Sequence, residues 1–384
     1  MSLRRTEYED WKQTSLILFL VFCTYAFIIV KYAEKFSGDF SGFICLGERY
    51  ALHAPIPKDL FVFRGTPGYD GQFFYMACFD PWIRGDMHAY MDTPAYRYQR
   101  MLYPLLASWL AAGKPDFFPY TLVIVNVVFI LVGTYYSIKL LGKMHLNPYW
   151  SFFYALNFGF LFCVFRDLAT PVALGLLVGG FYFYESRHMM MSMVLFSLSI
   201  LTRELMFIPI AGIVIYEGTV QRDWKKAGCL ALSLVPFILW QGYIYDRIGS
   251  LPFGGGKLNF GMPLVDVWNY LKQCLSDPNP KRNIEKLFAI LFILLWISTL
   301  IISIRAILIT FRLWTTYTLI LFAGLSLFLT KTIWVEPWSY SRVLSPFFTL
   351  LFIHFMHTRE KILWVPLFLI PVLFCIALIW VELF

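Results

Sequence analysis

One acidic residue in a glycine-flanked, aromatic stretch is the first candidate for chemistry in this sequence. Residues 68–81 read GYDGQFFYMACFDP, which places Asp70 and Asp80 in a chain that is otherwise strongly apolar. A carboxylate can take the proton of a hydroxyl group as that hydroxyl attacks a sugar carbon. Asp70 is therefore a candidate general base. It is equally suited to cap a helix over residues 71–79, and the two roles can coexist. Asp80, followed by Pro81, favours a structural role at the end of that helix.

Short polar turns between apolar runs supply more charge. Arg166 and Asp167 form one such turn, and Arg203 and Glu204 form another. Two or three arginines can hold a phosphate leaving group through paired hydrogen bonds. Each turn also has a local structural interpretation, in which the two neighbours form an ion pair, and Asp167 is placed to cap the helix that follows it. The sequence leaves both interpretations open.

The candidate substrate-binding residues share a predicted position on one face of the molecule and a side chain that can hydrogen-bond, pair with a charge or stack. They are Tyr69, Gln72, Tyr75, Arg100, Arg166, Asp167, Arg203, Glu204, Glu336, Tyr340 and Arg342. Tyrosines are also common at any membrane interface. The cysteines and histidines lack the spacing of a zinc site, and no metal or cofactor is predicted. Cys45 and Cys78 share one loop and could pair in an oxidising compartment, but two cysteines alone leave both the paired and the free states open. The GGGK stretch at residues 254–257 lacks the spacing of a P-loop.

Composition indicates the elements that must position these residues. The chain has 384 residues, 59% of them hydrophobic, and a mean hydropathy of +0.64, well beyond soluble domains. Its apolar runs predict an all-α polytopic membrane bundle of about eleven spans. They cover residues 16–30, 122–141, 152–165, 169–183, 190–201, 205–216, 230–245, 287–309, 313–329, 344–357 and 362–384. We expect one integral membrane domain.

The basic residues of short loops predict the orientation. With the N-terminus inside, Lys139, Arg187, Lys225, Arg305 and Arg359 all fall in inner loops, as the positive-inside rule requires. This also accounts for the net charge of +8 without a nucleic-acid partner. Residues 98–112 are apolar but short, and we expect a helix lying in the outer interface. Residues 31–116 and 246–285 are then long outer loops, and the candidate residues lie on the outer face.

The order of these motifs resembles the GT-C superfamily of polytopic glycosyltransferases, which use polyprenyl-phosphate-linked sugars. The likeness rests on YDGQFFY with a downstream Asp-Pro, on the RYQRMLYP segment, on FRDLA around Asp167 and on LTRE at residues 201–204. It covers roughly the first 220 residues in the order of elements. The combination looks like bacterial members implicated in cell-surface glycan assembly.

The resemblance implies an inverting sugar transfer on the periplasmic face of the bacterial inner membrane. The acceptor would be a cell-envelope glycan, lipid or protein. An acid of the first outer loop is the base in such enzymes, which corresponds to Asp70, and arginines near the interface hold the donor phosphate, which corresponds to Arg166, Arg203 and Arg342. The first loop has no clear DxD and the chain has no WWD segment. We therefore predict transfer that does not require a metal.

Two other classes of function fit a polytopic membrane protein. A lipid-linked-glycan transporter or flippase would place charges near the bilayer midplane and often shows internal repeats. A scaffold of a glycan-export complex would carry a degenerate site. The charges of this chain gather at one face and no repeat is evident, which favours the enzyme.

Overall fold

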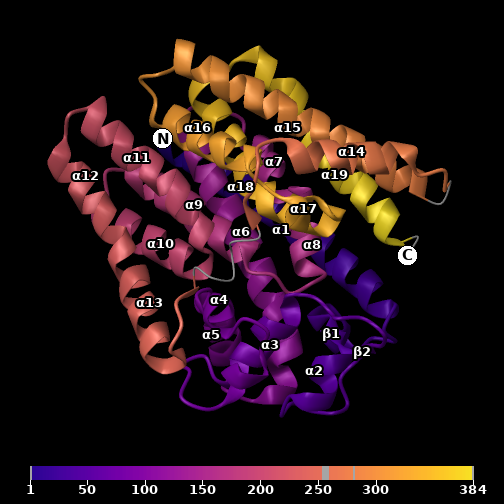
Figure 1. Cartoon of the computed structure of the whole chain (residues 1–384). Coiled ribbons are helices and arrows are strands. Elements are labelled where there is room, and N and C mark those ends of the chain that lie inside the picture. The colour runs from indigo at the N-terminus through magenta and orange to yellow at the C-terminus, as the bar shows by residue number, and fades with distance from the viewer. Residues whose placement is uncertain (1, 253–258, 280–281, 383–384) are drawn as a thin grey trace.

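The computed structural model describes residues 2–252, 259–279 and 282–382. It is a bundle of helices, which confirms the all-α prediction (Figure 1). Each predicted apolar run falls mainly on one or more helices within the described residues. The bundle helices are α1 (Ser2–Glu34), α6 (Phe118–Lys143), α7 (Phe152–Ala155), α8 (Phe158–Val164), α9 (Thr170–Glu185), α10 (Met189–Thr202), α11 (Phe207–Thr219), α12 (Trp224–Ala231), α13 (Val235–Ile248), α15 (Asn283–Ile309), α16 (Trp314–Leu327), α18 (Pro337–Thr358) and α19 (Trp364–Glu382).

Five helical segments in the described part of the chain are long and apolar enough to cross a membrane. They are Trp11–Glu34, Pro115–Lys143, Trp224–Ile248, Asn283–Ile309 and Lys361–Val381. Other predicted spans are shorter: α9 has 16 residues, α10 and α16 have 14 each, and α11 has 13, whereas a straight span needs about 20. The chain thus has the long apolar helices of an integral membrane protein. The number eleven and the GT-C arrangement stay predictions.

The predicted span over residues 152–165 is broken into two short helices at Asn157. The Asn157 side chain accepts a hydrogen bond from the Gly159 amide at 3.0 Å, so it caps α8, and its Nδ2 donates to the Ser345 carbonyl oxygen at 3.2 Å. A Cβ atom at position 159 would collide with the Ser345 hydroxyl group. Glycine therefore lets α8 pack directly on α18, the helix that carries Arg342.

Residues 31–116 form a compact body at the lower end of the view in Figure 1. Its elements are β1 (Leu46–Gly47), α2 (Glu48–His53), β2 (Val62–Phe63), α3 (Gly71–Phe79), α4 (Pro94–Tyr98) and α5 (Leu102–Leu110). β1 and β2 pair in parallel. The short apolar helix predicted at residues 98–112 is α5, whose nine residues are too few to span. Buried aromatic residues of this body, such as Tyr75 and Tyr103, pack with Leu122 of α6 and Trp240 of α13.

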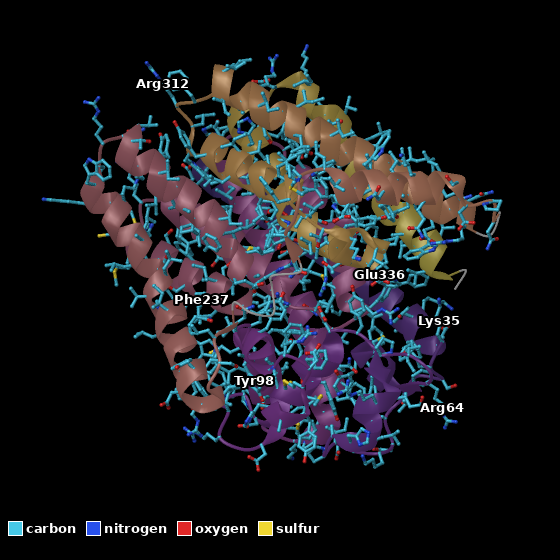
Figure 2. The ribbon with its side chains drawn as sticks, viewed as in Figure 1. Lys35, Arg64, Tyr98, Phe237, Arg312 and Glu336 are labelled. Carbon is cyan, nitrogen blue, oxygen red and sulfur yellow. The ribbon has the colours of Figure 1, made fainter. Side chains whose placement is uncertain are left out.

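The two ends of the molecule carry different loops. In Figure 2, Arg64 of the first loop lies at one end and Arg312, from a predicted inner loop, lies at the other. This separation agrees with loops on opposite membrane faces, although which face is cytoplasmic stays a prediction. Within its described residues, the second predicted outer loop, 246–285, contains the helix α14 (Val265–Ser276) between the end of α13 and the start of α15. A short helix, α17 (Lys331–Trp334), precedes α18. The GGGK stretch lies outside the described residues.

Candidate functional site

A cavity of about 780 Å³ lies where the first-loop body meets the bundle. We call it the Asp70 cavity. Its polar side comes mainly from α4, from the turn between α10 and α11, and from α18, and its apolar side from α11, α13 and α16. The lining residues are Asp70, Asp92, Thr93, Tyr96, Arg97, Gln99, Arg100, Arg203, Glu204, Leu205, Phe207, Phe237, Pro252, Asn259, Phe260, Leu325, Leu329, Thr332, Ile333, Ser339, Arg342 and Val343.

Asp70 stands at the start of α3, but its side chain does not cap that helix. Its backbone is already helical and it makes no capping hydrogen bond, so capping by this side chain, one of the two roles considered, is wrong. Its Oδ1 accepts from Arg97 Nη1 at 2.7 Å, and its Oδ2 accepts from Arg342 Nη1 at 2.5 Å. The next residue, Gly71, holds α3 against the bundle, because a Cβ atom there would collide with the Arg166 carbonyl oxygen.

The position of the Arg97 side chain is fixed by contacts other than its ion pair with Asp70. Asp92 takes two of its donors, Nε at 2.9 Å and Nη2 at 2.8 Å. The guanidinium group also lies over the ring of Phe73, 4.0 Å from its centroid, which is within range of a cation–π contact. One Nη group is left to donate to Asp70, so the position of the Asp70 carboxylate is set by residues from α3, α4 and α18.

These contacts determine the charge of Asp70. Burial by itself would raise the pKa of this carboxyl group, but the guanidinium groups of Arg342, Arg97 and Arg100 outweigh burial and lower its pKa well below the usual range. Asp70 is therefore a carboxylate at any physiological pH. With both oxygens held by arginines, it is a weak proton acceptor in this arrangement, because the cations favour the charged form.

A second ion pair lies across the cavity, from the turn after α4 to the turn before α11. Arg100 donates to Glu204 through Nε at 2.8 Å and through Nη2 at 2.5 Å, and Nη2 also donates to the Tyr96 hydroxyl oxygen at 2.7 Å. Burial acts to raise the pKa of Glu204, but Arg100 outweighs it and the pKa is lowered. The predicted ion pair between the neighbours Arg203 and Glu204 is wrong, because Glu204 pairs with a residue 104 positions away.

Arg203 is a buried cation without a carboxylate partner among the described residues. Only 6% of it is exposed. Its Nη1 donates to the Thr170 hydroxyl oxygen and, at 2.9 Å, to the Arg342 carbonyl oxygen, and its Nε has no hydrogen-bond partner. Burial, together with Arg100 and Arg342, lowers the pKa of Arg203 to about 10, so it stays charged at neutral pH. The lining of the cavity thus holds four arginines against three carboxylates, which leaves one formal positive charge in excess.

Arg166 and Asp167 lie outside the Asp70 cavity. Arg166 donates to Cys45 Sγ at 2.7 Å, and its guanidinium carbon lies 4.4 Å from the ring centroid of Trp338. Asp167 is fully buried, has a positive φ of 47°, and neither of its carboxylate oxygens has a partner. The local ion pair and the helix cap predicted for this turn are therefore both wrong. Burial raises the pKa of Asp167 well above its ordinary value.

The remaining predicted residues serve other contacts. Gln72 is buried, its Oε1 accepts from the Gly47 amide at 3.0 Å and its Nε2 donates to the Pro67 carbonyl oxygen at 3.0 Å. Tyr75 is fully buried in the first-loop body. Tyr69 and Glu336 do not line the cavity. The Tyr69 ring is near Arg342, and burial raises the pKa of Glu336, with Arg166 and Arg342 opposing that rise. Tyr340 is fully buried and contacts Tyr270 on α14.

Of the predicted set, the cavity brings together Asp70, Arg100, Arg203, Glu204 and Arg342. The predicted substrate-binding set left out the partners of these residues, above all Asp92 and Tyr96, and also Arg97, which was expected on the outer face but given no role. Arg97 and Arg100 are three positions apart in a segment that folds as a short helical turn, so a common direction was available as a signal. No such signal existed for Asp92, because its ion pair with Arg97 depends on the path of the loop between α3 and α4.

The structure has Cys45 and Cys78 as free thiols. Cys45 contacts Arg166, and Cys78 donates to the Phe74 carbonyl oxygen within α3. Among the described residues no group of three or more His, Cys, Asp or Glu side chains is placed to hold a metal ion. Comparison with protein-family models, with curated proteins and with solved structures gave no match.

Proposed function

We propose that the protein is a membrane glycosyltransferase of GT-C type. It moves a sugar from a polyprenyl-phosphate donor to a cell-envelope acceptor on the outer face of the bacterial inner membrane, with inversion, and Asp70 is the general base. One observation carries this proposal: a carboxylate, Asp70, and an uncompensated buried arginine, Arg203, share one cavity with a large apolar wall. The cavity volume lies within the range of ligand sites, about 300–1,000 Å³.

The chemistry requires one proton acceptor and one anion site. An acceptor hydroxyl oxygen attacks the anomeric carbon, the bond from that carbon to the phosphate oxygen breaks, and its electron pair leaves on the phosphate. The hydroxyl proton goes to the Asp70 carboxylate. Arg203 and Arg342 stabilise the charge that develops on the leaving phosphate, because both have a buried Nε group without a protein partner.

The two ion pairs of Asp70 support an order in which the donor binds before the proton is transferred. In the ligand-free arrangement Asp70 is the anion bound by Arg342 and Arg97. A donor phosphate competes for the same guanidinium groups, and Asp70 becomes a better base as it loses them. Donor binding therefore precedes proton transfer. This order also limits wasteful attack by water before a donor is present.

The apolar side of the cavity suits the lipid part of such a donor. Leu205, Phe207, Phe237, Leu325 and Leu329 line it. Phe207 is 45% exposed, at the first residue of α11, so the wall continues to the surface of the bundle. An isoprenoid chain buries apolar area on this wall at about 25 cal/mol per Å², while its phosphate reaches the arginines.

Turnover of polyprenyl-phosphate sugars by the purified full-length protein tests the proposal. We expect wild type to consume at least one donor in a panel of hexose and pentose derivatives, and Asp70→Asn to consume none. Asp80→Asn is the matched control, since Asp80 accepts only from the backbone amides of Arg84 and Gly85. Donor bound but never consumed, over a broad acceptor panel, would favour a transporter or a scaffold instead.

A further inference from the structure

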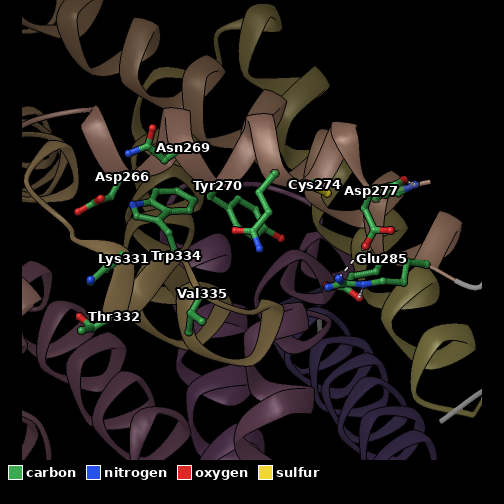
Figure 3. Close-up of a pocket in the computed structure, with 13 residues that line it drawn as sticks. Asp266, Asn269, Tyr270, Cys274, Asp277, Glu285, Lys331, Thr332, Trp334 and Val335 are labelled. Atoms are coloured by element: carbon green, nitrogen blue, oxygen red, sulfur yellow. Dashed lines mark hydrogen bonds and ion pairs between the residues drawn. The ribbon is translucent and has the colours of Figure 1, made fainter. Parts of the chain in front are cut away.

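A second pocket, of about 640 Å³, lies beneath α14. We call it the α14 pocket. It is lined by Asp266, Asn269, Tyr270, Gln273, Cys274, Asp277, Arg282, Glu285, Lys286, Lys331, Thr332, Trp334 and Val335. Figure 3 shows Asp266 and Asn269 towards one end, Asp277 and Glu285 at the other, and Tyr270 and Trp334 between them. Thr332 also lines the Asp70 cavity, but none of these residues has an assigned role in the proposed transfer.

The helix α14 has two different faces. Asp266, Asn269, Tyr270, Gln273 and Cys274 recur at helical spacing and all line the pocket. Other positions carry exposed apolar side chains, including Val265, Trp268 and Leu275, each at least half exposed. Such a two-faced helix is suited to lie in the membrane interface with its apolar face in the lipid. The polar face is then presented to the pocket at the level of the lipid headgroups.

The aromatic floor of the pocket is held rigid. Tyr270 donates to or accepts from the Tyr340 hydroxyl group at 3.1 Å. The ring of Trp334 lies 5.5 Å from that of Tyr340 and 6.4 Å from that of Tyr270, measured between centroids. Only part of this floor is accessible, because Trp334 is 1% exposed, while Tyr270 is half-buried. Tyr270 therefore supplies the ring surface on which a ligand can pack.

The formal charges of the pocket balance, and its one arginine is already paired. Arg282 donates to Asp277 at 2.8 Å and to Glu285 through two hydrogen bonds, at 3.0 and 2.8 Å. The lining contains three acids and three bases, so it has no excess charge to recruit a phosphate. Asn269 and Gln273 are exposed amides. Planar side chains that both donate and accept hydrogen bonds are suited to neutral ligands with many hydroxyl groups.

We propose that the α14 pocket binds a neutral saccharide, and that this saccharide is the acceptor chain of the transfer. The claim that the saccharide is the acceptor rests on the proposed function, whereas the claim that the pocket binds a saccharide does not. A sugar chain presents alternating apolar C–H faces and hydroxyl edges, which match Tyr270 and the amides and carboxylates of α14. A zwitterionic lipid headgroup is the competing ligand, but its phosphate and amine would have to separate the existing pairs of Arg282.

The short helix α17 connects the two sites. Thr332 lines both the α14 pocket and the Asp70 cavity, Ile333 lines the Asp70 cavity, and Trp334 lines the α14 pocket. Consecutive residues thus face two cavities, and one thin wall separates them. A chain seated in the α14 pocket passes over α17 to place its terminal hydroxyl group near Asp70. The acceptor and the lipid donor then approach from different sides.

Saccharide binding by the full-length protein, without any donor, tests the inference. The probes are oligosaccharides of two to six rings of glucose, mannose, galactose, arabinose or N-acetylglucosamine. We expect wild type to bind at least one of them and the double variant Asn269→Ala/Gln273→Ala to bind it at least tenfold more weakly. Lys272→Ala is the matched control, since Lys272 is exposed on the same helix, lies over Trp268 and does not line the pocket.

Three results would overturn it: no binding of any probe, equal binding by the double variant, or equal loss in Lys272→Ala. Binding of phosphatidylethanolamine vesicles at α14, without binding of any oligosaccharide, would assign the pocket to lipid. Failure of the proposed function is recognised separately, because it is scored as donor turnover and leaves saccharide binding intact. If transfer is found, the double variant should raise KM for the acceptor and leave kcat within about twofold.

Discussion

Asp70 and Arg342 are 272 residues apart in the sequence, and their side chains form an ion pair of 2.5 Å. The contact connects the start of α3, in the first-loop body, with the second turn of α18, in the bundle. It also places an acid of the protein in the position where an anionic ligand would bind. Asp70 is therefore both the candidate base and a competitor of the donor phosphate.

This competition predicts opposite effects of Asp70→Asn on binding and on turnover. The substitution removes a negative charge from Arg342 and Arg97, so we expect farnesyl phosphate to bind about tenfold more tightly, equivalent to about 1.4 kcal/mol, while transfer is lost. Calorimetric titration in detergent measures the affinity. Asp80→Asn should match wild type. Weaker binding by Asp70→Asn would show that Asp70 acts as a structural ion pair and not as a displaced counter-ion.

Arg203→Gln should weaken anion binding at little cost to the fold. Arg203 has no carboxylate partner among the described residues and its Nε is unpaired, so its removal leaves no buried acid uncompensated. We expect the affinity for farnesyl phosphate to fall at least tenfold and the melting temperature to change by no more than a few degrees. Unchanged affinity would remove Arg203 from the phosphate site.

Glu204→Gln, at the residue next to Arg203, should by contrast lower the stability of the fold. It leaves Arg100, a largely buried cation, without its paired carboxylate. Charge-assisted hydrogen bonds of this kind are each worth about 1.5–3 kcal/mol, so the free energy of unfolding should fall by an amount of that order. Thermal or denaturant unfolding in detergent measures it. A stable Glu204→Gln protein would mean that Tyr96 and solvent suffice for Arg100.

Gln72→Leu should affect stability and leave substrate affinity unchanged. Gln72 was predicted to bind substrate, but its amide joins the Gly47 amide and the Pro67 carbonyl group inside the first-loop body. Leaving those buried groups unpaired costs about 1–3 kcal/mol. The expected result is a lower melting temperature with the KM for the donor within twofold of wild type. A large rise in KM at unchanged stability would return Gln72 to the binding site.

The helices were predictable because their signal is local. Apolar runs predicted every bundle helix except α12, most of which lies before the predicted run at residues 230–245. Charges in a short turn pointed to Arg203 and Glu204, and a charge in the long first loop pointed to Asp70. Pairing was not predictable, because it depends on contacts distant in sequence. Local interpretations assigned Glu204 to Arg203 and Asp70 to a helix cap, whereas Arg100 and Arg342 take those carboxylates. Aromatic residues misled for a related reason: Tyr75 and Tyr340 were candidates for substrate binding or for the membrane interface, yet both are fully buried in aromatic clusters.

Asp167→Asn should stabilise the protein at neutral pH. Burial raises the pKa of Asp167 in the folded state above its unfolded value of about 3.9. Between those two values the folded state binds more protons than the unfolded state, so the free energy of unfolding falls as the pH rises through that interval. Asparagine cannot ionise and tolerates the left-handed backbone found at this position, where φ is 47°.

The measurement is the melting temperature of wild type and Asp167→Asn from pH 5 to pH 8. The stabilities should converge towards pH 5, and the variant should be the more stable protein at pH 8. The titration of Asp70 and Glu204 does not contribute to the pH dependence of the melting temperature in this range. Their pKa values are lowered in the folded state, so their contributions are complete above about pH 5 and change only in more acidic solution. Asp167→Ala is the control for the backbone, because alanine disfavours a positive φ. Identical pH profiles for wild type and Asp167→Asn would show that Asp167 finds a partner for its charge in the membrane-embedded protein.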